Sequence, residues 1–166
     1  MMPRRYFEIK GNQERLENII TEWLGVKYHH GGKNKFGIDC TNFIAVILLE
    51  MKILRRMEKP FYYAPDWYLH SKKDICLDSI QENIDKFLSG WLVAERFQYV
   101  SQDELKYGDM VCISVNKLGL INHVAIYLGN NKIAHCINNI GVVTSQFSYV
   151  YARHTKYYYR LFCEGE

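Results

Sequence analysis

The chain has 166 residues, of which 48% are hydrophobic, 23% are charged and only 3 are proline, as is typical of a folded globular protein and not of a disordered or collagen-like chain. Its 21 basic and 18 acidic side chains give a net charge of +3, which is too small to indicate a nucleic-acid partner. The longest apolar run, Phe43 to Leu49, is far shorter than the ~20 residues of a membrane-spanning helix. We therefore expect one domain over residues 1–166 and no membrane span.

The first predicted helix extends from Asn12 to Gly25. We expect Asn12 to be its N-cap and Gly25 to end it. The apolar side chains in this segment recur at the spacing of one helix face, at Leu16, Ile19, Ile20, Trp23 and Leu24.

The next segment, from Tyr28 to Asp39, is rich in glycine and turn-forming residues, which predicts an irregular loop. A second helix should start at Cys40, with Asp39 as its N-cap. Because the run from Phe43 to Leu49 is apolar on all sides, this helix should be buried.

From about residue 57 to residue 100 the residue pattern of the sequence changes. We interpret this stretch as a helical insertion with a helix between Ile75 and Trp91. Short β runs separated by turn signals follow it. We predict strands over Met110 to Val115, His123 to Leu128, Lys132 to Ile137, Val142 to Ser145 and Tyr157 to Phe162. Helices first and an antiparallel meander second indicate an α+β domain.

Cys40 differs from the other cysteines because it follows a glycine-rich loop and lies in the first turn of a predicted helix. The N–H groups and the positive dipole end at that position lower the pKa of a cysteine thiol, and the thiolate is a nucleophile for acyl transfer. The same N–H groups can receive an oxyanion. The alternative is that Cys40 is a small buried residue. The other cysteines are widely spaced and suggest no metal site; they are Cys76, Cys112, Cys136 and Cys163.

Two histidines lie on consecutive predicted strands and could serve as a base and its orienting group. A two-residue turn would pair Ile126 with His135 and send His123 to the opposite face. A three-residue loop over Gly129–Asn131 instead pairs Ala125 with His135, which puts His123 diagonally adjacent on the same face. We predict the three-residue loop, with a left-handed residue in it.

Two blocks of the sequence together resemble a known family. The first contains the tyrosine, glycine pair and Asp-Cys step at Tyr28, Gly31-Gly32 and Asp39-Cys40. The second contains Gly108-Asp109, the stretch from Asn122 to Gly129, and Ile133-Ala134-His135. Both are similar to the NlpC-type cysteine peptidases of bacterial cell walls, a papain-like group.

The resemblance implies a papain-like fold in which the nucleophile starts a buried helix packed on a C-terminal antiparallel sheet. It makes Cys40 the nucleophile, His123 the general base and His135 the residue that orients His123, with no cofactor and no metal. It also implies cleavage of peptidoglycan stem peptides, at the bond between γ-D-glutamate and a diamino acid.

We expect four further residues to bind substrate, two of them, Tyr28 and Asp39, on the basis of the same resemblance. They are Tyr28, which would assist the oxyanion site, Asp39, which would hold a substrate amine, and Thr41 and Asn122. The alternatives are core packing for Tyr28 and a plain helix cap for Asp39. Relatives usually carry Ser-Gly after the nucleophile, where this chain has Thr41-Asn42.

Two other functions are kept open. The same triad could act on a different amide, ester or thioester, or the chain could be a non-catalytic phage-tail assembly module. The insertion is similar to the longer linkers of phage-associated members, which makes a phage-tail partner an expectation. The segment from Met1 to Lys10 shows no signal peptide. We therefore expect a protein that is cytoplasmic as synthesised and delivered to the wall by a phage or a secretion system.

Overall fold

The computed structural model describes residues 4–54, 64–70, 72 and 97–163. Its main sheet is antiparallel, with strand order β1-β9-β5-β6-β7-β8, and β4 also pairs with β9. The strands are β1 (Arg4–Arg5), β4 (Phe97–Tyr99), β5 (Met110–Ile113), β6 (His123–Tyr127), β7 (Lys132–Ile137), β8 (Gly141–Gln146) and β9 (Thr155–Cys163). The α+β prediction is confirmed, and the strands lie close to their expected bounds.

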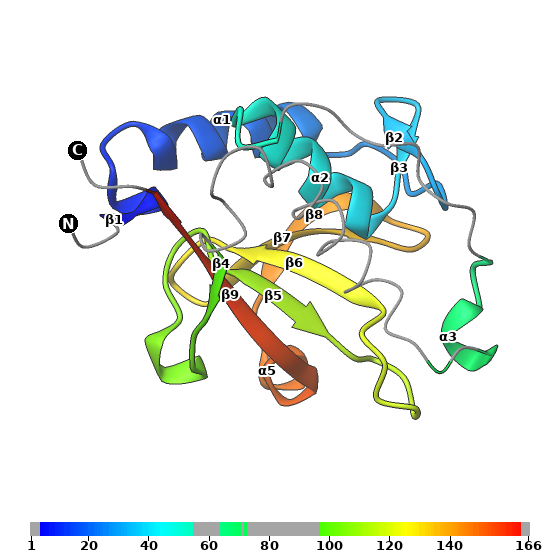
Figure 1. Cartoon of the computed structure of the whole chain (residues 1–166). Helices are drawn as coiled ribbons and strands as arrows, with labels where there is room; N and C mark the ends of the chain where they lie inside the picture. Colours follow the sequence, from blue (N-terminus) through cyan, green and yellow to red (C-terminus); the bar gives the residue numbers. More distant parts are fainter. Residues whose placement is uncertain (1–3, 55–63, 71, 73–96, 164–166) are drawn as a thin grey trace.

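Two helices cover one face of this sheet, and a short helix covers the other (Figure 1). The first face carries α1 (Asn12–Trp23) and α2 (Cys40–Glu50), and the second carries α5 (Tyr149–His154). Because both faces are covered, β5 is buried along its whole length and β6 and β7 are buried over most of theirs. Two of these three strands, β6 and β7, carry the candidate histidines His123 and His135.

The N-cap of helix α1 lies one residue before the predicted N-cap, Asn12. Its N-cap is Gly11, with a left-handed φ of +90°, and the side chain of Asn12 instead donates to the carbonyl oxygen of Tyr6 at 2.8 Å. Asn12 is used to close the preceding 3-10 turn η1 (Tyr6–Glu8), so it is not available to cap α1. The helix ends before Gly25, as expected.

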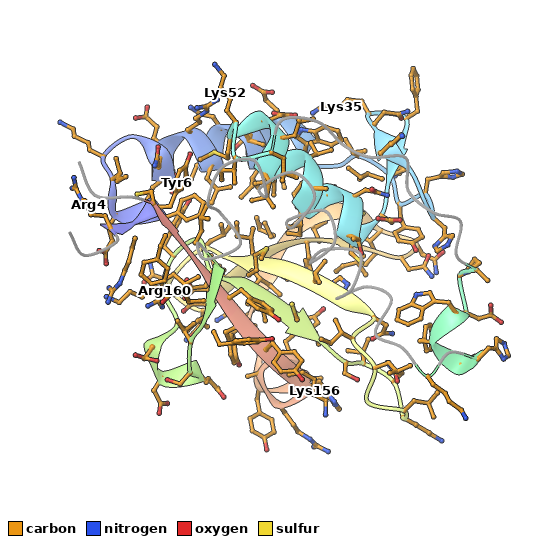
Figure 2. All side chains as sticks on the ribbon, viewed as in Figure 1. Arg4, Tyr6, Lys35, Lys52, Lys156 and Arg160 are labelled. Atoms are coloured by element: carbon orange, nitrogen blue, oxygen red, sulfur yellow. The ribbon has the colours of Figure 1, made fainter. Side chains whose placement is uncertain are left out.

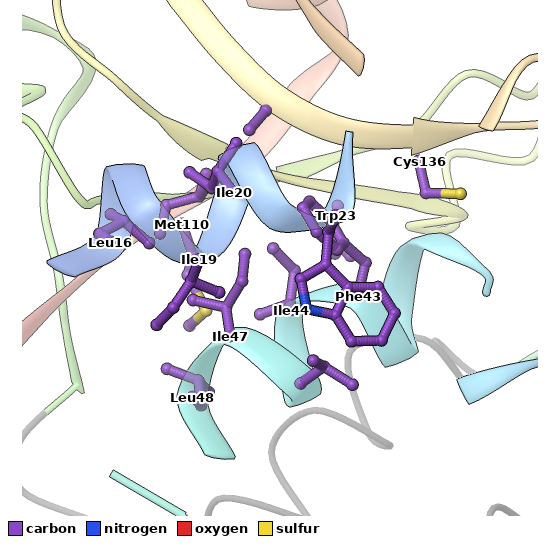
Figure 3. Packing of buried hydrophobic residues seen from close by; sticks show 14 of the residues in the cluster. Leu16, Ile19, Ile20, Trp23, Phe43, Ile44, Ile47, Leu48, Met110 and Cys136 are labelled. Carbon is purple, nitrogen blue, oxygen red and sulfur yellow. The ribbon is translucent and has the colours of Figure 1, made fainter. Parts of the chain in front are cut away.

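The helix α2 starts at Cys40, and Asp39 caps it as predicted. Asp39 Oδ1 accepts a hydrogen bond from the backbone N–H of Asn42 at 2.8 Å. Figure 3 shows the apolar side chains of α1 and α2 packed together against the sheet, which contributes Met110 and Cys136. Burial of this cluster fixes the position of the α2 N-terminus relative to the strands.

The segment before α2 is more regular than the predicted loop. It contains a small hairpin, in which β2 (Lys33–Asn34) pairs with β3 (Gly37–Ile38). Strands of two residues are too short to give an alternating pattern, so the sequence could not reveal them.

A buried ion pair joins the start of β5 to β9. Asp109 accepts hydrogen bonds from Arg160 Nε at 2.9 Å and from Arg160 Nη2 at 2.7 Å, and from the backbone N–H of Lys106. Arg160 also donates to the carbonyl oxygen of Glu104. Figure 2 shows Arg160 at the same end of the molecule as Arg4, near the start of the chain.

Most of the predicted insertion, including its helix from Ile75 to Trp91, lies outside the described residues. Within it the structure describes the short helix α3 (Trp67–His70). A second 3-10 turn, η3 (Gln102–Glu104), precedes β5. None of the helices in the described ranges has the length and apolar character needed to cross a bilayer.

Candidate active site

Cys40 is the first residue of α2, and α2 packs against β6 and β7. The side chain is partly buried, and its Sγ lies 3.9 Å from Thr41 Oγ1. At this position, the first turn of a helix, the positive end of the helix dipole favours a negative charge. A thiolate at Cys40 or an oxyanion beside it would be stabilised there.

The two histidines are in direct contact. His123 Nε2 lies 2.8 Å from His135 Nδ1, and the two rings meet edge to face at a centroid distance of 5.0 Å. The contact follows from the register of the β6–β7 hairpin, in which Ile126 pairs with Ala134 and Tyr127 with Ile133.

This register is that of the predicted three-residue loop. All three loop residues, Gly129, Asn130 and Asn131, have positive φ, and the backbone N–H of Lys132 donates to the carbonyl oxygen of Gly129 at 2.9 Å. Glycine and asparagine adopt this left-handed region at the lowest cost. The loop therefore sets which face of the sheet both histidines occupy.

His135 is fully buried and has partners at both ring nitrogens. Its Nδ1 faces His123, and its Nε2 lies 2.8 Å from Ser145 Oγ on β8. Burial, and then the charge of His123, lower the pKa of His135 to about 3. His135 is therefore neutral at any pH near 7, and it can orient His123 without competing for its proton.

The ring nitrogens of His123 have different surroundings. Because Nε2 faces His135, Nδ1 is the nitrogen left to exchange a proton with a nucleophile. His123 is partly exposed, at the first position of β6, so a reacting group can approach it. The pair thus has the form of a base and its orienting residue.

Asp39 connects the glycine-rich segment to α2. Its Oδ1 caps the helix, and its Oδ2 accepts a hydrogen bond from the backbone N–H of Gly31 at 2.8 Å. The side chain is only 2% exposed. The structure therefore shows the capping role, and a contact between Asp39 and a substrate amine stays a prediction.

Tyr28 lies beside the strand that leads into α2. It forms a parallel bridge with Ile38, and its hydroxyl is 3.4 Å from His30 Nδ1. Thr41 is buried next to the nucleophile. Asn122 immediately precedes β6, and its Oδ1 accepts from the backbone N–H of Val115 at 2.9 Å, so it holds the loop that ends at His123.

Cys136 points to the face opposite to His135, as strand alternation predicts. Its Sγ donates to the carbonyl oxygen of Ile38 at 3.1 Å. Burial, followed by the nearby Cys40 and Asp39, raises the pKa of this thiol to about 12. The thiol of Cys136 is therefore unreactive near neutral pH.

No disulfide joins the described cysteines, which are Cys40, Cys112, Cys136 and Cys163, while Cys76 lies outside the described residues. Within the same part of the chain, no group of three or more His, Cys, Asp or Glu side chains is arranged to hold a metal ion.

Sequence reasoning missed Ser145. The residue lies ten positions after His135, on the strand that pairs with β7, and reaches the buried ring from there. Once a β7–β8 hairpin is assumed, a polar side chain at alternating spacing within an expected strand would have been the signal.

Comparison with known proteins gives a consistent picture. The model of the NlpC/P60 family matches residues 25–160. The chain is 28% identical to the "Probable endopeptidase NlpC homolog" of Haemophilus influenzae over 136 residues, which cover 82% of this chain and 55% of that protein. It is 24% identical to the "Murein DD-endopeptidase MepS/Murein LD-carboxypeptidase" of Escherichia coli K12 over 156 residues, covering 86% of this chain and 66% of that protein.

The fold has solved counterparts as well. A Staphylococcus aureus protein of the NLP/P60 family, described as similar to lipoprotein, superimposes with a TM-score of 0.63 at 19% identity, over 99% of this chain and 45% of that one. The predicted papain-like arrangement of the NlpC type is thereby confirmed at the level of fold. The chain spans 55% and 66% of the lengths of the two curated relatives named above.

Proposed function

The chain belongs to the NlpC/P60 family, and on this basis we propose that it is a cysteine endopeptidase that hydrolyses peptidoglycan stem peptides. The curated relatives are named as endopeptidases, which supports this class of reaction. The observation that carries the proposal is the contact between His123 and the buried, neutral His135, on strands packed against the helix that begins at Cys40.

In the proposed mechanism, the proton of Cys40 Sγ passes to His123 Nδ1, and the thiolate attacks the carbonyl carbon of the substrate amide. The positive end of the α2 dipole stabilises the oxyanion that forms. His123 then returns its proton to the leaving nitrogen as the C–N bond breaks, leaving a thioester on Cys40. A water molecule gives a proton to His123 and attacks the thioester carbon; the C–S bond breaks, the acid is released, and His123 returns the proton to Cys40 Sγ.

His135 serves as the orienting group in this scheme. Its burial and its low pKa keep it neutral, so it can accept a hydrogen bond from the charged His123 ring without a second positive charge in the site. The triad of Cys40, His123 and His135 thus divides nucleophile, base and support among three elements of the fold.

For the bond cleaved, we propose the link between γ-D-glutamate and the diamino acid, on the strength of the two sequence blocks. The E. coli relative is named for DD-endopeptidase and LD-carboxypeptidase activities, which concern other bonds. A test must therefore offer substrates that contain all three kinds of bond. Thr41 lies beside the nucleophile, and we propose that it contacts the substrate together with Tyr28, Asp39 and Asn122.

The proposal is tested with a defined disaccharide-tetrapeptide, its free tetrapeptide and a DD-crosslinked dimer, and the products are identified by mass spectrometry. Wild type should cleave at least one of them, and Cys40→Ala none. Cys163→Ala is the matched control, because Cys163 is another partly exposed free thiol, at the end of β9, and its loss should leave cleavage unchanged. Cleavage by Cys40→Ala would refute the mechanism.

A different acyl substrate is the second candidate. Asn42, where relatives usually carry glycine, is 7% exposed and packs in the first turn of α2. It therefore adds bulk in the first turn of the helix that begins at the nucleophile. If wild type leaves all three wall fragments intact but releases acid from a small ester or thioester in a Cys40-dependent manner, the same machinery serves that substrate class.

A further inference from the structure

The buried ring of His135 has contacts on both sides. His123 Nε2 lies 2.8 Å from Nδ1, and Ser145 Oγ lies 2.8 Å from Nε2. A neutral imidazole has one N–H donor and one acceptor nitrogen, so the two contacts must run in opposite senses. The hydroxyl of Ser145 can act in either sense, and its direction is coupled to that of His123.

Two arrangements satisfy these contacts. In the first, His135 carries its proton on Nδ1 and donates to His123, while Ser145 donates to Nε2. In the second, His123 donates from Nε2 to Nδ1 of His135, which donates from its own Nε2 to Ser145 Oγ. An imidazolium carries protons on both nitrogens, so a charged His123 is compatible with the second arrangement alone.

We propose that Ser145 is a positioning residue for the nucleophile and base, because its hydroxyl accepts the Nε2–H of His135 and thereby keeps Nδ1 free to accept from His123. This inference rests on the proposed function, since it needs His123 to act as the base. In the activation step only one proton moves, from Cys40 Sγ to His123 Nδ1. The protons on His123 Nε2, His135 Nε2 and Ser145 Oγ stay on their atoms.

The surroundings of the ring suit this role. The aromatic ring of Tyr151 on α5 meets His135 edge to face at a centroid distance of 5.5 Å, and His135 is 0% exposed. Buried polar groups of this kind are normally hydrogen-bonded, so the loss of a partner is unfavourable. Ser145 is itself only partly buried, so its own O–H can donate to solvent while its oxygen accepts from His135.

Within the part of the chain that the structure describes, the titratable groups whose rings contact His135 are His123 from β6 and Tyr151 from α5. Because burial holds the pKa of His135 near 3, its ring remains a neutral acceptor when His123 is charged. Without the Ser145 hydroxyl, the Nε2–H of the buried His135 loses the acceptor that the structure shows for it, which disfavours this tautomer and hence the charged form of His123.

The first test needs no substrate. The rate at which iodoacetamide alkylates Cys40, followed by mass spectrometry of its peptide, is measured against pH for wild type, Ser145→Ala, Ser145→Thr and Ser145→Val. Thr and Val have the same shape and differ in the hydroxyl. We expect the pH midpoint to move upward by about one unit in the Ala and Val variants and to stay near the wild-type value in Ser145→Thr.

Thr144→Ala is the matched control, because Thr144 is the exposed neighbour on β8, and its midpoint should not change. Thermal melting identifies any variant that fails to fold, and the Thr and Val pair remains informative if Ser145→Ala is unstable. Equal midpoints in Ser145→Thr and Ser145→Val would overturn the proposal.

The second test observes the tautomer directly, by ¹⁵N NMR of histidine-labelled protein. In wild type His135 should be protonated at Nε2 and not at Nδ1, whereas Ser145→Val should lose this preference. Protonation of wild-type His135 at Nδ1 would refute the role of Ser145. Failure of wild type to cleave wall peptides, with the expected midpoints and tautomer, would instead count against the proposed substrate.

Discussion

The thiol of Cys136 donates to the carbonyl oxygen of Ile38, two residues before the candidate nucleophile Cys40. Cys136 follows His135 on β7 but points to the other face of the sheet, toward α2. One strand therefore supports both parts of the site, because its His135 contacts His123 while its Cys136 holds the chain that enters α2.

This contact predicts that Cys136 resists thiol reagents even though it lies close to Cys40. Since its pKa is raised to about 12, almost none of it is thiolate at pH 8, and only the thiolate reacts. With limiting iodoacetamide at pH 8, peptide mass spectrometry should find Cys40 modified well before Cys136. Equal modification of the two in folded protein would contradict the burial of Cys136.

The two histidines should differ in their contribution to catalysis. His123→Ala removes the proposed base and should lower kcat by about 10²- to 10⁴-fold. His135→Gln keeps polar atoms on both sides of the site and should cost about tenfold, since a less well placed amide then orients the base. Single-turnover cleavage of the substrate identified above gives both values. A larger loss for His135→Gln than for His123→Ala would reverse the assigned roles.

His135 also makes stability depend on pH. Its pKa is about 3 in the folded chain and near 6.5 when unfolded, so the unfolded state binds more protons between these values. The contribution of the neutral His135 ring to the free energy of unfolding is fully present above pH 6.5 and is lost as the pH falls toward 3. Urea unfolding at pH 7 and pH 4.5 should show this loss in wild type and a smaller one in His135→Gln. The same pH dependence in both would show that His135 is not its source.

The strand register around the candidate site was predictable, because a loop of three residues suited to left-handed backbone leaves one pairing that puts both histidines on one face. The start of α2 was predictable as well, since Asp39 and the apolar run after Cys40 are local signals. The predicted N-cap of α1 was wrong because the Asn12 side chain donates a hydrogen bond to the carbonyl oxygen of Tyr6. This contact depends on how the preceding turn folds back.

Ser145 could not be found from local patterns. Its contact with His135 depends on the pairing of β7 with β8, in which Ile133 lies opposite Ser145 and Val143 opposite His135. Diagonal neighbours of this kind are set by register, and a serine within a short β run carries no chemical signature of its own. The ion-pair partner of Asp109 could not be predicted from the sequence for the same reason, because Arg160 lies on a strand far along the chain.

The pair of Asp109 and Arg160 should be a major source of stability. Arg160 is 5% exposed and Asp109 1%, so removal of one partner leaves a buried charge without compensation. Arg160→Ala should lower the free energy of unfolding by about 3–5 kcal/mol. Glu8→Gln is the control, because its ion pair with Arg5 is at the surface and should contribute less than about 1 kcal/mol. Similar effects of the two substitutions on urea unfolding would contradict this ranking.

A glycine at the turn between β7 and β8 allows that hairpin to approach the end of α1. Gly141 has φ of +108°, and a Cβ there would lie 2.2 Å from the carbonyl oxygen of Val26, which accepts a hydrogen bond from Val142 N. Gly141→Ala must therefore displace backbone and break this contact. Gly129→Ala has a similar positive φ but meets nothing closer than 3.8 Å, so it should cost only about 1–2 kcal/mol. Thermal unfolding of both should show the greater loss for Gly141→Ala, and an equal loss would mean that the hairpin does not need this close approach.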